Sequence, residues 1–157
     1  MLRQHHGEGD RTPAAVAVFL NAIIERHSIR PAVPTPFDGH SRIALDAYVA
    51  RLAKYAESPE TISPGIFPAA LCYVERFLGM NPGVPLTRRN VHRLLLACVV
   101  VAIKFFEDRF YKLEFYARVG GVKKGEMTAL QNAILSMIDF RLDIAPEEYA
   151  RYEAQLR

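Results

Sequence analysis

The stretch LLLACVVVAIK, residues 94–104, is apolar at its first ten positions and ends on a lysine. Ten successive apolar residues place hydrophobic side chains on every face of a helix, and such a helix is normally buried on all sides. A membrane-spanning helix needs about 20 such residues, so this stretch is too short for one. We therefore expect a helix in the centre of a domain, covered by its neighbours.

The same stretch is rich in β-branched residues, so residues 98–103 also allow a reading as a buried strand. The length of the pattern, the capping residue Thr87 and the lack of hairpin turns favour a helix over residues 87–106.

Apolar residues recur at helical spacing on both sides of this central helix. Thr12 with Pro13, and Ser63 with Pro64, are suited to begin helices, and the pair Gly120–Gly121 is suited to end one. The predicted fold class is all-α, with a five-helix core around the central buried helix and an extra helix at each end. The other predicted helices span residues 12–27, 41–56, 63–80, 113–119 and 123–138, with a last one from Pro146 onward.

The organisation of the chain follows from these helices. Residues 1–11 are polar and are predicted to be a disordered tail, and residues 143–157 carry the last helix. Residues 12–40 hold the first helix and a connector with Pro31, Pro34 and Pro36, since prolines exclude a helix interior and a central strand. The first helix could pack on the domain, bind a partner or exchange between copies.

Composition excludes several classes of function. The chain has 157 residues, enough for one domain, and its 20 Lys and Arg against 17 Asp and Glu give a formal charge of +3. This charge is too mild to indicate nucleic-acid binding, for which basic residues are expected to cluster on one face. Cys72 and Cys98 lie in apolar runs without paired spacing, and the start of the chain lacks the apolar stretch of a signal peptide. We expect reduced core cysteines in an intracellular protein of the cytoplasm or nucleus, without a membrane partner.

Motifs of catalysis are not found in the sequence. There is no GxSxG, no HExxH and no paired Cys and His spacing. The segment GGVKKG, residues 120–125, resembles a phosphate loop, but Glu126 stands at the position of the phosphate-binding lysine. His27, His40 and His92 lie in different elements and do not predict a metal site. We expect no enzymatic activity, no cofactor, no metal and no small-molecule substrate.

Lys104 poses a problem of solvation, because burying an ammonium group without a partner costs several kcal/mol. One explanation is that Lys104 extends to solvent at the end of its helix, with Asp108 four residues on. The other is that it lies beside an apolar surface patch and donates hydrogen bonds to another chain. Six aromatic residues follow it too closely for one helix face to bury them, so some of them are expected at the surface. They are Phe105, Phe106, Phe110, Tyr111, Phe115 and Tyr116. About half are expected to fill the core beneath the 113–119 helix.

The segment VVAIKFFEDRFYKLEFYARVGGV, residues 100–122, resembles the cyclin box. It is most similar to the box of the single-box P/U-type cyclins, a phosphate-pathway cyclin-like subfamily. Members carry a lysine on the third box helix, an aspartate four residues on, and a tyrosine-rich segment ending in YAxVGG(V/I). Lys104, Asp108, Tyr111 and residues 116–122 match this pattern. Residues 126–142, EMTALQNAILSMIDFRL, resemble the fifth box helix and its exit, so the resemblance covers residues 41–142.

The resemblance implies a regulatory subunit that binds and activates a cyclin-dependent protein kinase, in the cell cycle or in nutrient-linked signalling. Such a subunit packs against a mobile helix of the kinase and holds it in the active position. Lys104 is implied to bond to backbone near that helix, and Asp108 to reach the activation-loop arginines. The kinase-binding residues implied by position are Lys104, Phe105, Glu107, Asp108, Gln131, Leu135, Phe140 and Leu142.

The sequence departs from the family pattern in two places. Most cyclins have a glutamate where Gln131 stands, and a neutral amide accepts a hydrogen bond from Lys104 without the charge-assisted component. Lys104 is then paired with Gln131, or with Glu107 or Asp108 instead. The chain also has no tryptophan and no MRAIL-like segment, so the substrate-docking pocket of cell-cycle cyclins is not expected.

Two other functions remain open from the sequence. General initiation factors share the cyclin fold, so a transcription or DNA-binding protein, or a scaffold without a kinase partner, is the main alternative. The near balance of charges argues against DNA binding. An enzyme with an unrecognised pocket is the second alternative.

Overall fold

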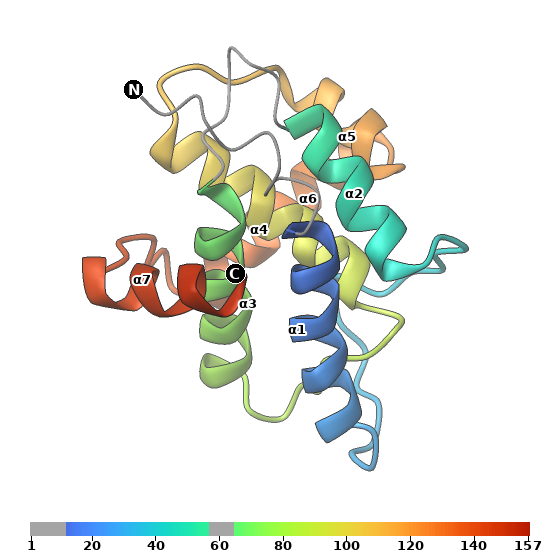
Figure 1. Cartoon of the computed structure of the whole chain (residues 1–157). Helices are drawn as coiled ribbons and strands as arrows, with labels where there is room; N and C mark the ends of the chain where they lie inside the picture. The colour runs from blue at the N-terminus through green and yellow to red at the C-terminus, as the bar shows by residue number, and fades with distance from the viewer. Residues whose placement is uncertain (1–11, 57–64) are drawn as a thin grey trace.

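The computed structural model describes residues 12–56 and 65–157, apart from the side chains of Tyr55 and Ala56. Across these ranges the chain forms helices and irregular segments only, which confirms the predicted all-α class. The predicted tail of residues 1–11 and the predicted helix start at Ser63 and Pro64 lie outside the described residues. The helices, arranged as in Figure 1, are α1 (Thr12–Arg26), α2 (Leu45–Ala56), α3 (Ile66–Met80), α4 (Val91–Phe106), α5 (Leu113–Gly120), α6 (Lys124–Met137) and α7 (Pro146–Gln155).

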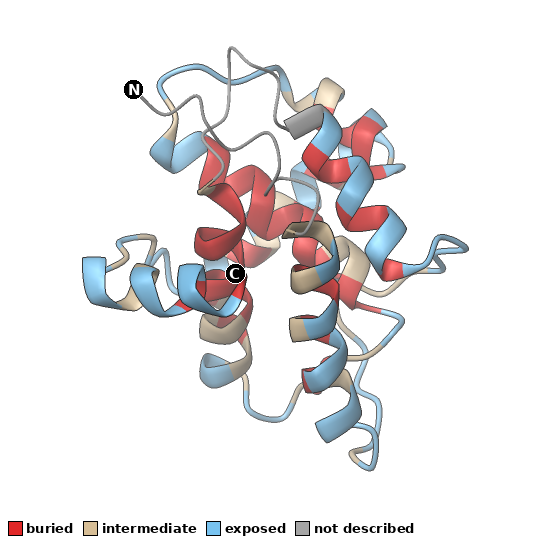
Figure 2. Cartoon of the chain, viewed as in Figure 1, coloured by how far each residue is buried: buried red, intermediate tan, exposed pale blue. Residues whose placement is uncertain are grey.

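The apolar stretch forms most of α4, so the helical reading of residues 98–103 is confirmed and the strand reading is wrong. Every residue from Leu94 to Ile103 is buried, and α4 is the element around which Figure 2 shows burial concentrated. Helix α4 packs mainly on α3 and α6 and also contacts α2 and α5. The central helix expected from the sequence is therefore present.

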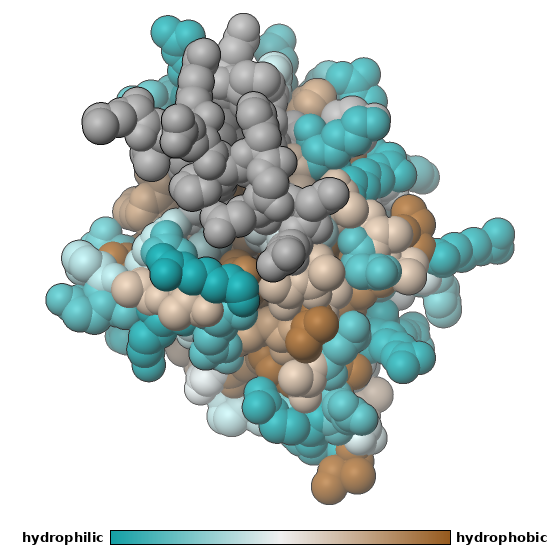
Figure 3. Space-filling model, viewed as in Figure 1, coloured by the Kyte–Doolittle hydropathy of each residue, from teal (hydrophilic) through white to brown (hydrophobic). Residues whose placement is uncertain are grey.

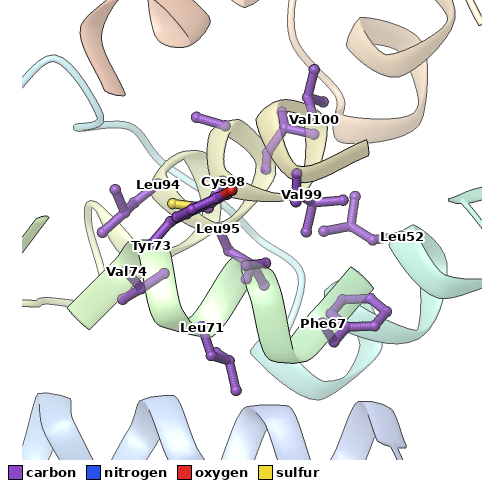
Figure 4. Close-up of a cluster of buried hydrophobic side chains, with 14 of the residues drawn as sticks. Leu52, Phe67, Leu71, Tyr73, Val74, Leu94, Leu95, Cys98, Val99 and Val100 are labelled. Carbon is purple, nitrogen blue, oxygen red and sulfur yellow. The ribbon is translucent and has the colours of Figure 1, made fainter. Parts of the chain in front are cut away.

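The core is densest where α3 and α4 cross. Figure 4 shows Cys98 of α4 beside Tyr73 of α3 and Leu95 of α4 directed toward α3, with Leu71 on the side of α3 that faces α1 and Leu52 of α2 at the edge of the same cluster. All five residues are at most 1% exposed. Fully burying an aliphatic side chain stabilises the folded state by about 1.5–3 kcal/mol, so this cluster is a main source of stability.

Two helices begin later than predicted. Helix α2 begins at Leu45 rather than Ser41, because the Ser41 hydroxyl accepts the Ile43 N–H (3.3 Å) in a local turn and His92 bonds the Ile43 carbonyl (2.9 Å). Helix α4 begins at Val91 rather than Thr87. The residues just before it form a separate turn in which the Asn90 side chain accepts the Thr87 N–H (2.9 Å).

The glycine pair ends α5, as predicted. Gly121 adopts a left-handed conformation with φ of 73°, which glycine reaches without strain. The N–H groups of Gly121 and Val122 bond the carbonyls of Arg118 (3.2 Å) and Ala117 (2.9 Å), which satisfies the end of the helix. Residues 120–125 are therefore a helix terminus followed by the start of α6.

The two outer helices pack on the core. Helix α1 lies against α2, and the His27 ring after its end accepts the Leu86 N–H (2.9 Å). Helix α7 lies against α3, and Tyr152 contacts Phe19 of α1 edge to face with ring centroids 6.2 Å apart. Of the roles considered for the first helix, the structure therefore shows packing on the domain.

The connector after α1 is anchored in the same core. Its Phe37 is fully buried and packs edge to face on Phe77 of α3, with ring centroids 5.4 Å apart. On the face shown in Figure 3, hydrophobic residues gather over α1 and hydrophilic ones surround them. In the ranges 12–56 and 65–157, every helix is too short or too polar to span a bilayer.

Candidate functional site

Lys104 lies in the last turn of α4, immediately after the buried stretch, and its side chain is exposed. Its Nζ donates to Gln131 Oε1 of α6 at 2.8 Å, across 27 residues of sequence. The ammonium group also lies 5.9 Å from the centroid of the Phe110 ring. Lys104 therefore reaches solvent at the negative end of the helix dipole, and it also borders aromatic rings.

The pairing with Gln131 answers one question left by the sequence. Of the three candidate partners of Lys104, the hydrogen bond goes to the amide that replaces the usual glutamate. Glu107 is half-buried and Asp108 is exposed beyond the end of α4. Because the amide is neutral, the Lys104–Gln131 pair keeps a full positive charge.

Exposed aromatic rings surround this charge. Phe105 and Phe106 contact each other edge to face (4.9 Å between centroids), and both are exposed by more than 40%. Phe110 and Tyr111 are also exposed. We call these four rings, with Lys104, the α4-end patch.

The two remaining rings point into the domain. Tyr116 is buried and its hydroxyl accepts the Tyr111 N–H at 3.0 Å. Phe115 is half-buried between Tyr111 (4.3 Å) and Tyr116 (5.5 Å). The sequence placed about half of the six rings in the core, whereas the structure buries one and half-buries one. The reason is that α5 is only two turns long and has room for few large side chains beneath it.

The second part of the predicted set lies at the end of α6. Leu135 is half-buried one turn after Gln131, and its carbonyl accepts the Phe140 N–H at 2.8 Å. Asp139 and Phe140 have φ of 55° and 56°, in the left-handed region that residues with side chains rarely adopt. Phe140 is 67% exposed as a result of this turn. The backbone therefore takes a costly conformation at the point where it displays an aromatic ring.

The structure shows direct hydrogen bonds between only some of the predicted kinase-binding residues. Lys104 and Gln131 are bonded, and Leu135 is bonded through its backbone to Phe140. Leu142 is half-buried, and its carbonyl accepts the Tyr73 hydroxyl of α3 (2.7 Å). The predicted site set leaves out Phe106 and Phe110, which the structure places beside Phe105 and Lys104. The aromatic run after Lys104 was the signal that could have included them.

The two cysteines are part of the core rather than of a reactive site. Cys72 and Cys98 are free and buried, as predicted. The Cys72 thiol bonds Glu148 (2.9 Å), and burial together with this carboxylate raises its pKa to about 12 despite nearby Arg76. A thiol of that pKa stays protonated and is a poor nucleophile. Among the described residues, no group of His, Cys, Asp and Glu is placed to bind a metal ion.

Comparison with known proteins gives consistent matches. The family model described as Cyclin matches residues 14–142. Cyclin-P3-1 of Oryza sativa subsp. japonica is 43% identical over 124 residues, which are 78% of this chain and 50% of that protein. Cyclin-U4-1 of Arabidopsis thaliana is 33% identical over 162 residues, covering 96% of this chain and 78% of that protein. Cyclin-U3-1 of the same plant is 36% identical over 128 residues, covering 80% and 56%. The chain thus spans about half the length of some of the curated relatives it matches.

Proposed function

The chain belongs to the cyclin family and is of the P/U type, and on that premise we propose that it binds a cyclin-dependent protein kinase and activates it. Cyclins are regulatory subunits rather than enzymes. The kinase-binding surface is the α4-end patch together with Glu107, Asp108, Gln131, Leu135, Phe140 and Leu142.

The observation that carries this proposal is the Lys104–Gln131 pair among exposed rings. An ammonium group has three N–H donors, and Gln131 accepts one of them. The other two are available to carbonyl groups of a second chain. Because the Gln131 amide adds no negative charge, the positive charge of Lys104 is also available to a partner.

The surrounding rings supply the apolar part of such an interface. Aromatic side chains with a central charged residue are the usual composition of interface hot spots. Phe105, Phe106 and Phe110 are each 44–47% exposed, so contact with a partner would remove substantial apolar surface from water. Phe140 adds a further ring, held outward by its left-handed backbone. A mobile kinase helix packed here would gain both backbone hydrogen bonds and apolar contact.

The test is binding of the purified chain to a panel of purified cyclin-dependent kinases, measured together with phosphorylation of a peptide substrate. We expect at least one kinase to bind and to gain activity. In that complex, Lys104→Ala and Phe140→Ala should each weaken binding by about tenfold or more, because they remove an anchor charge and an exposed ring.

Matched controls remove similar groups elsewhere. Lys123→Ala deletes an exposed lysine just before α6, and Ile29→Ala deletes a side chain that is 93% exposed. Both should bind like the unmodified chain. Full kinase affinity in folded Lys104→Ala and Phe140→Ala would refute this surface. A complete failure of the unmodified chain to bind any kinase of the panel would refute the function.

A further inference from the structure

A second polar site lies at the other end of α4. The segment before α2, the first turn of α4 and the glycine turn after α5 enclose a surface pocket of about 240 Å³. Helices α2 and α5 lie beside each other at this position (Figure 1). Pockets for drug-sized ligands are typically about 300–1,000 Å³, so this one is suited to a single chemical group.

The pocket is lined by basic side chains. Arg42, Arg51 and Arg93 border it together with His40 and His92, and none of the described residues that line it is Asp or Glu. Guanidinium groups bind phosphate oxygens through pairs of parallel hydrogen bonds, so clustered arginines are the usual means of recognising a phosphoryl group.

Two of these arginines are held in place by the fold. Arg93 Nε donates to Glu126 Oε1 of α6 (3.0 Å), and Arg51 Nη2 donates to the Arg118 carbonyl of α5 (3.2 Å). Gly39 allows Arg93 this position, since a Cβ atom on Gly39 would lie 1.5 Å from an Arg93 guanidinium nitrogen. Each arginine thus uses one nitrogen for the fold and retains others for a ligand, although the charge of Arg93 is partly balanced by its ion pair with Glu126.

His92 also borders the pocket, and its ring is bonded to the backbone. Its Nε2 lies 2.9 Å from the Ile43 carbonyl, which can only accept, so Nε2 carries the proton and Nδ1 has a lone pair. Nδ1 is buried and, within the described part of the chain, has no hydrogen-bond partner. Because Nδ1 has almost no exposed surface, a ligand in the pocket does not reach it, and the arginines are the groups that remain for recognition.

We propose that this pocket binds the phosphoryl group of a phosphorylated peptide segment from another protein. The phosphoryl oxygens accept from Arg42, Arg51 and Arg93. Inorganic phosphate offers the same oxygens and is the other source of this group, so displacement of the chain from the phosphopeptide by an equal concentration of inorganic phosphate would assign the site to the free anion and refute the peptide.

The pocket is separate from the proposed kinase-binding surface. His92 and Lys104 are 12 residues apart on α4, which is about 18 Å at 1.5 Å per residue. Both sites can therefore be occupied at once, and phosphopeptide binding does not depend on kinase binding.

The experiment uses two immobilised pools of degenerate peptides, identical except that the central residue is phosphoserine in one and serine in the other. We expect the full chain to be retained at least tenfold more on the phosphoserine pool. The double variant Arg42→Gln/Arg51→Gln should lose this preference. Arg42→Gln alone should reduce this preference. Because Arg42 is exposed, the single variant replaces the double variant in the test if the double variant does not fold.

The matched control is Arg151→Gln, which removes an exposed arginine of α7 and should bind like the unmodified chain. Equal retention on both pools would overturn the inference, and so would unchanged retention of the folded variants. A third pool with glutamate at the centre should not retain the chain. If the glutamate pool retains the chain as strongly as the phosphoserine pool does, the site recognises charge alone and phosphoryl recognition is refuted. Kinase binding by the double variant should remain unchanged.

Discussion

Gly120 and Gly121 are neighbours in the chain but are glycines for different physical reasons. A Cβ atom on Gly120 would lie 2.2 Å from a methyl carbon of Leu96 in α4, so the backbone of α5 packs directly on the central helix. Gly121 has open space around its Cα and instead needs its positive φ. The first glycine therefore serves packing and the second serves the turn.

Substitution should separate these two roles. We expect Gly120→Ala to lower the free energy of unfolding by about 1–3 kcal/mol through overpacking against Leu96. Gly121→Ala should lower it by about 1–2 kcal/mol through backbone strain. Urea denaturation measures both changes.

Gly125 provides the control for this pair. It lies in the first turn of α6, and a Cβ atom added there would meet no other atom within 4 Å. Gly125→Ala should therefore be neutral or stabilising by up to about 1 kcal/mol. Equal stability of Gly120→Ala and Gly125→Ala would contradict tight packing of α5 on α4.

Among the elements, α4 depends most on the turn that precedes it. Asn90 is 2% exposed, accepts the Thr87 N–H (2.9 Å) and donates to the Pro85 carbonyl (3.0 Å). These two bonds close the turn of residues 87–90 and fix where α4 enters the core. The capping residue chosen from the sequence, Thr87, accepts the Arg89 N–H (3.2 Å) at an exposed position.

Loss of the Asn90 side chain should therefore destabilise the fold more than loss of the Thr87 hydroxyl. We expect Asn90→Ala to lower the free energy of unfolding by about 1–3 kcal/mol, because it leaves buried polar groups without partners. Thr87→Ala should cost less, about 0.5–1.5 kcal/mol. Chemical denaturation would contradict this account if it gave the opposite order.

The molecule as a whole is held together in part by histidine side chains that bond the backbone of connectors between helices. His27 bonds the backbone before α4, and His92 bonds the backbone before α2. Burial is the main cause that lowers the pKa of both histidines from 6.5. Nearby Arg30 and Arg26 lower the pKa of His27 further. At His92, the hydrogen bond to the Ile43 carbonyl raises the pKa, while nearby Arg93 lowers it. Protonation of either ring therefore works against the packing of these connectors.

This gives a pH dependence of stability with a definite sign. Below pH 6.5 the unfolded chain binds more protons than the folded one, so the free energy of unfolding should fall as pH falls through 6.5. The loss should level off once pH is below the lowered pKa of the folded state. Melting temperatures between about pH 7.5 and 5.5 would measure it.

The double variant His27→Gln/His92→Gln is the control for that slope. It should be less stable at neutral pH but should show a flatter dependence over the same range. An unchanged slope would assign the effect to other groups. Glu148 is not expected to contribute there, since its bond from Cys72 and nearby Arg76 lower its pKa and move its titration to more acidic pH.

Local patterns in the sequence were enough to predict the helices, the central position of α4 and the turn at Gly121. Each depends on neighbours within a few residues: apolar periodicity, an all-apolar run, or a residue that tolerates positive φ. The motif of residues 116–122 belongs to the same class only in part, because Gly121 serves the local turn whereas Gly120 serves packing on Leu96 of α4.

The partner of Lys104, the exposure of the rings, the true starts of α2 and α4, and the arginine pocket were not accessible in this way. Gln131 is 27 residues from Lys104, and Arg93 meets Glu126 across 33 residues. Such contacts depend on how α4, α5 and α6 pack. Side chains in similar local sequence become buried or exposed according to which helix covers them. Residues 94–104 thus predicted a buried helix with a charged end, while the packing of α6 against it determined that Gln131 holds that charge at the surface.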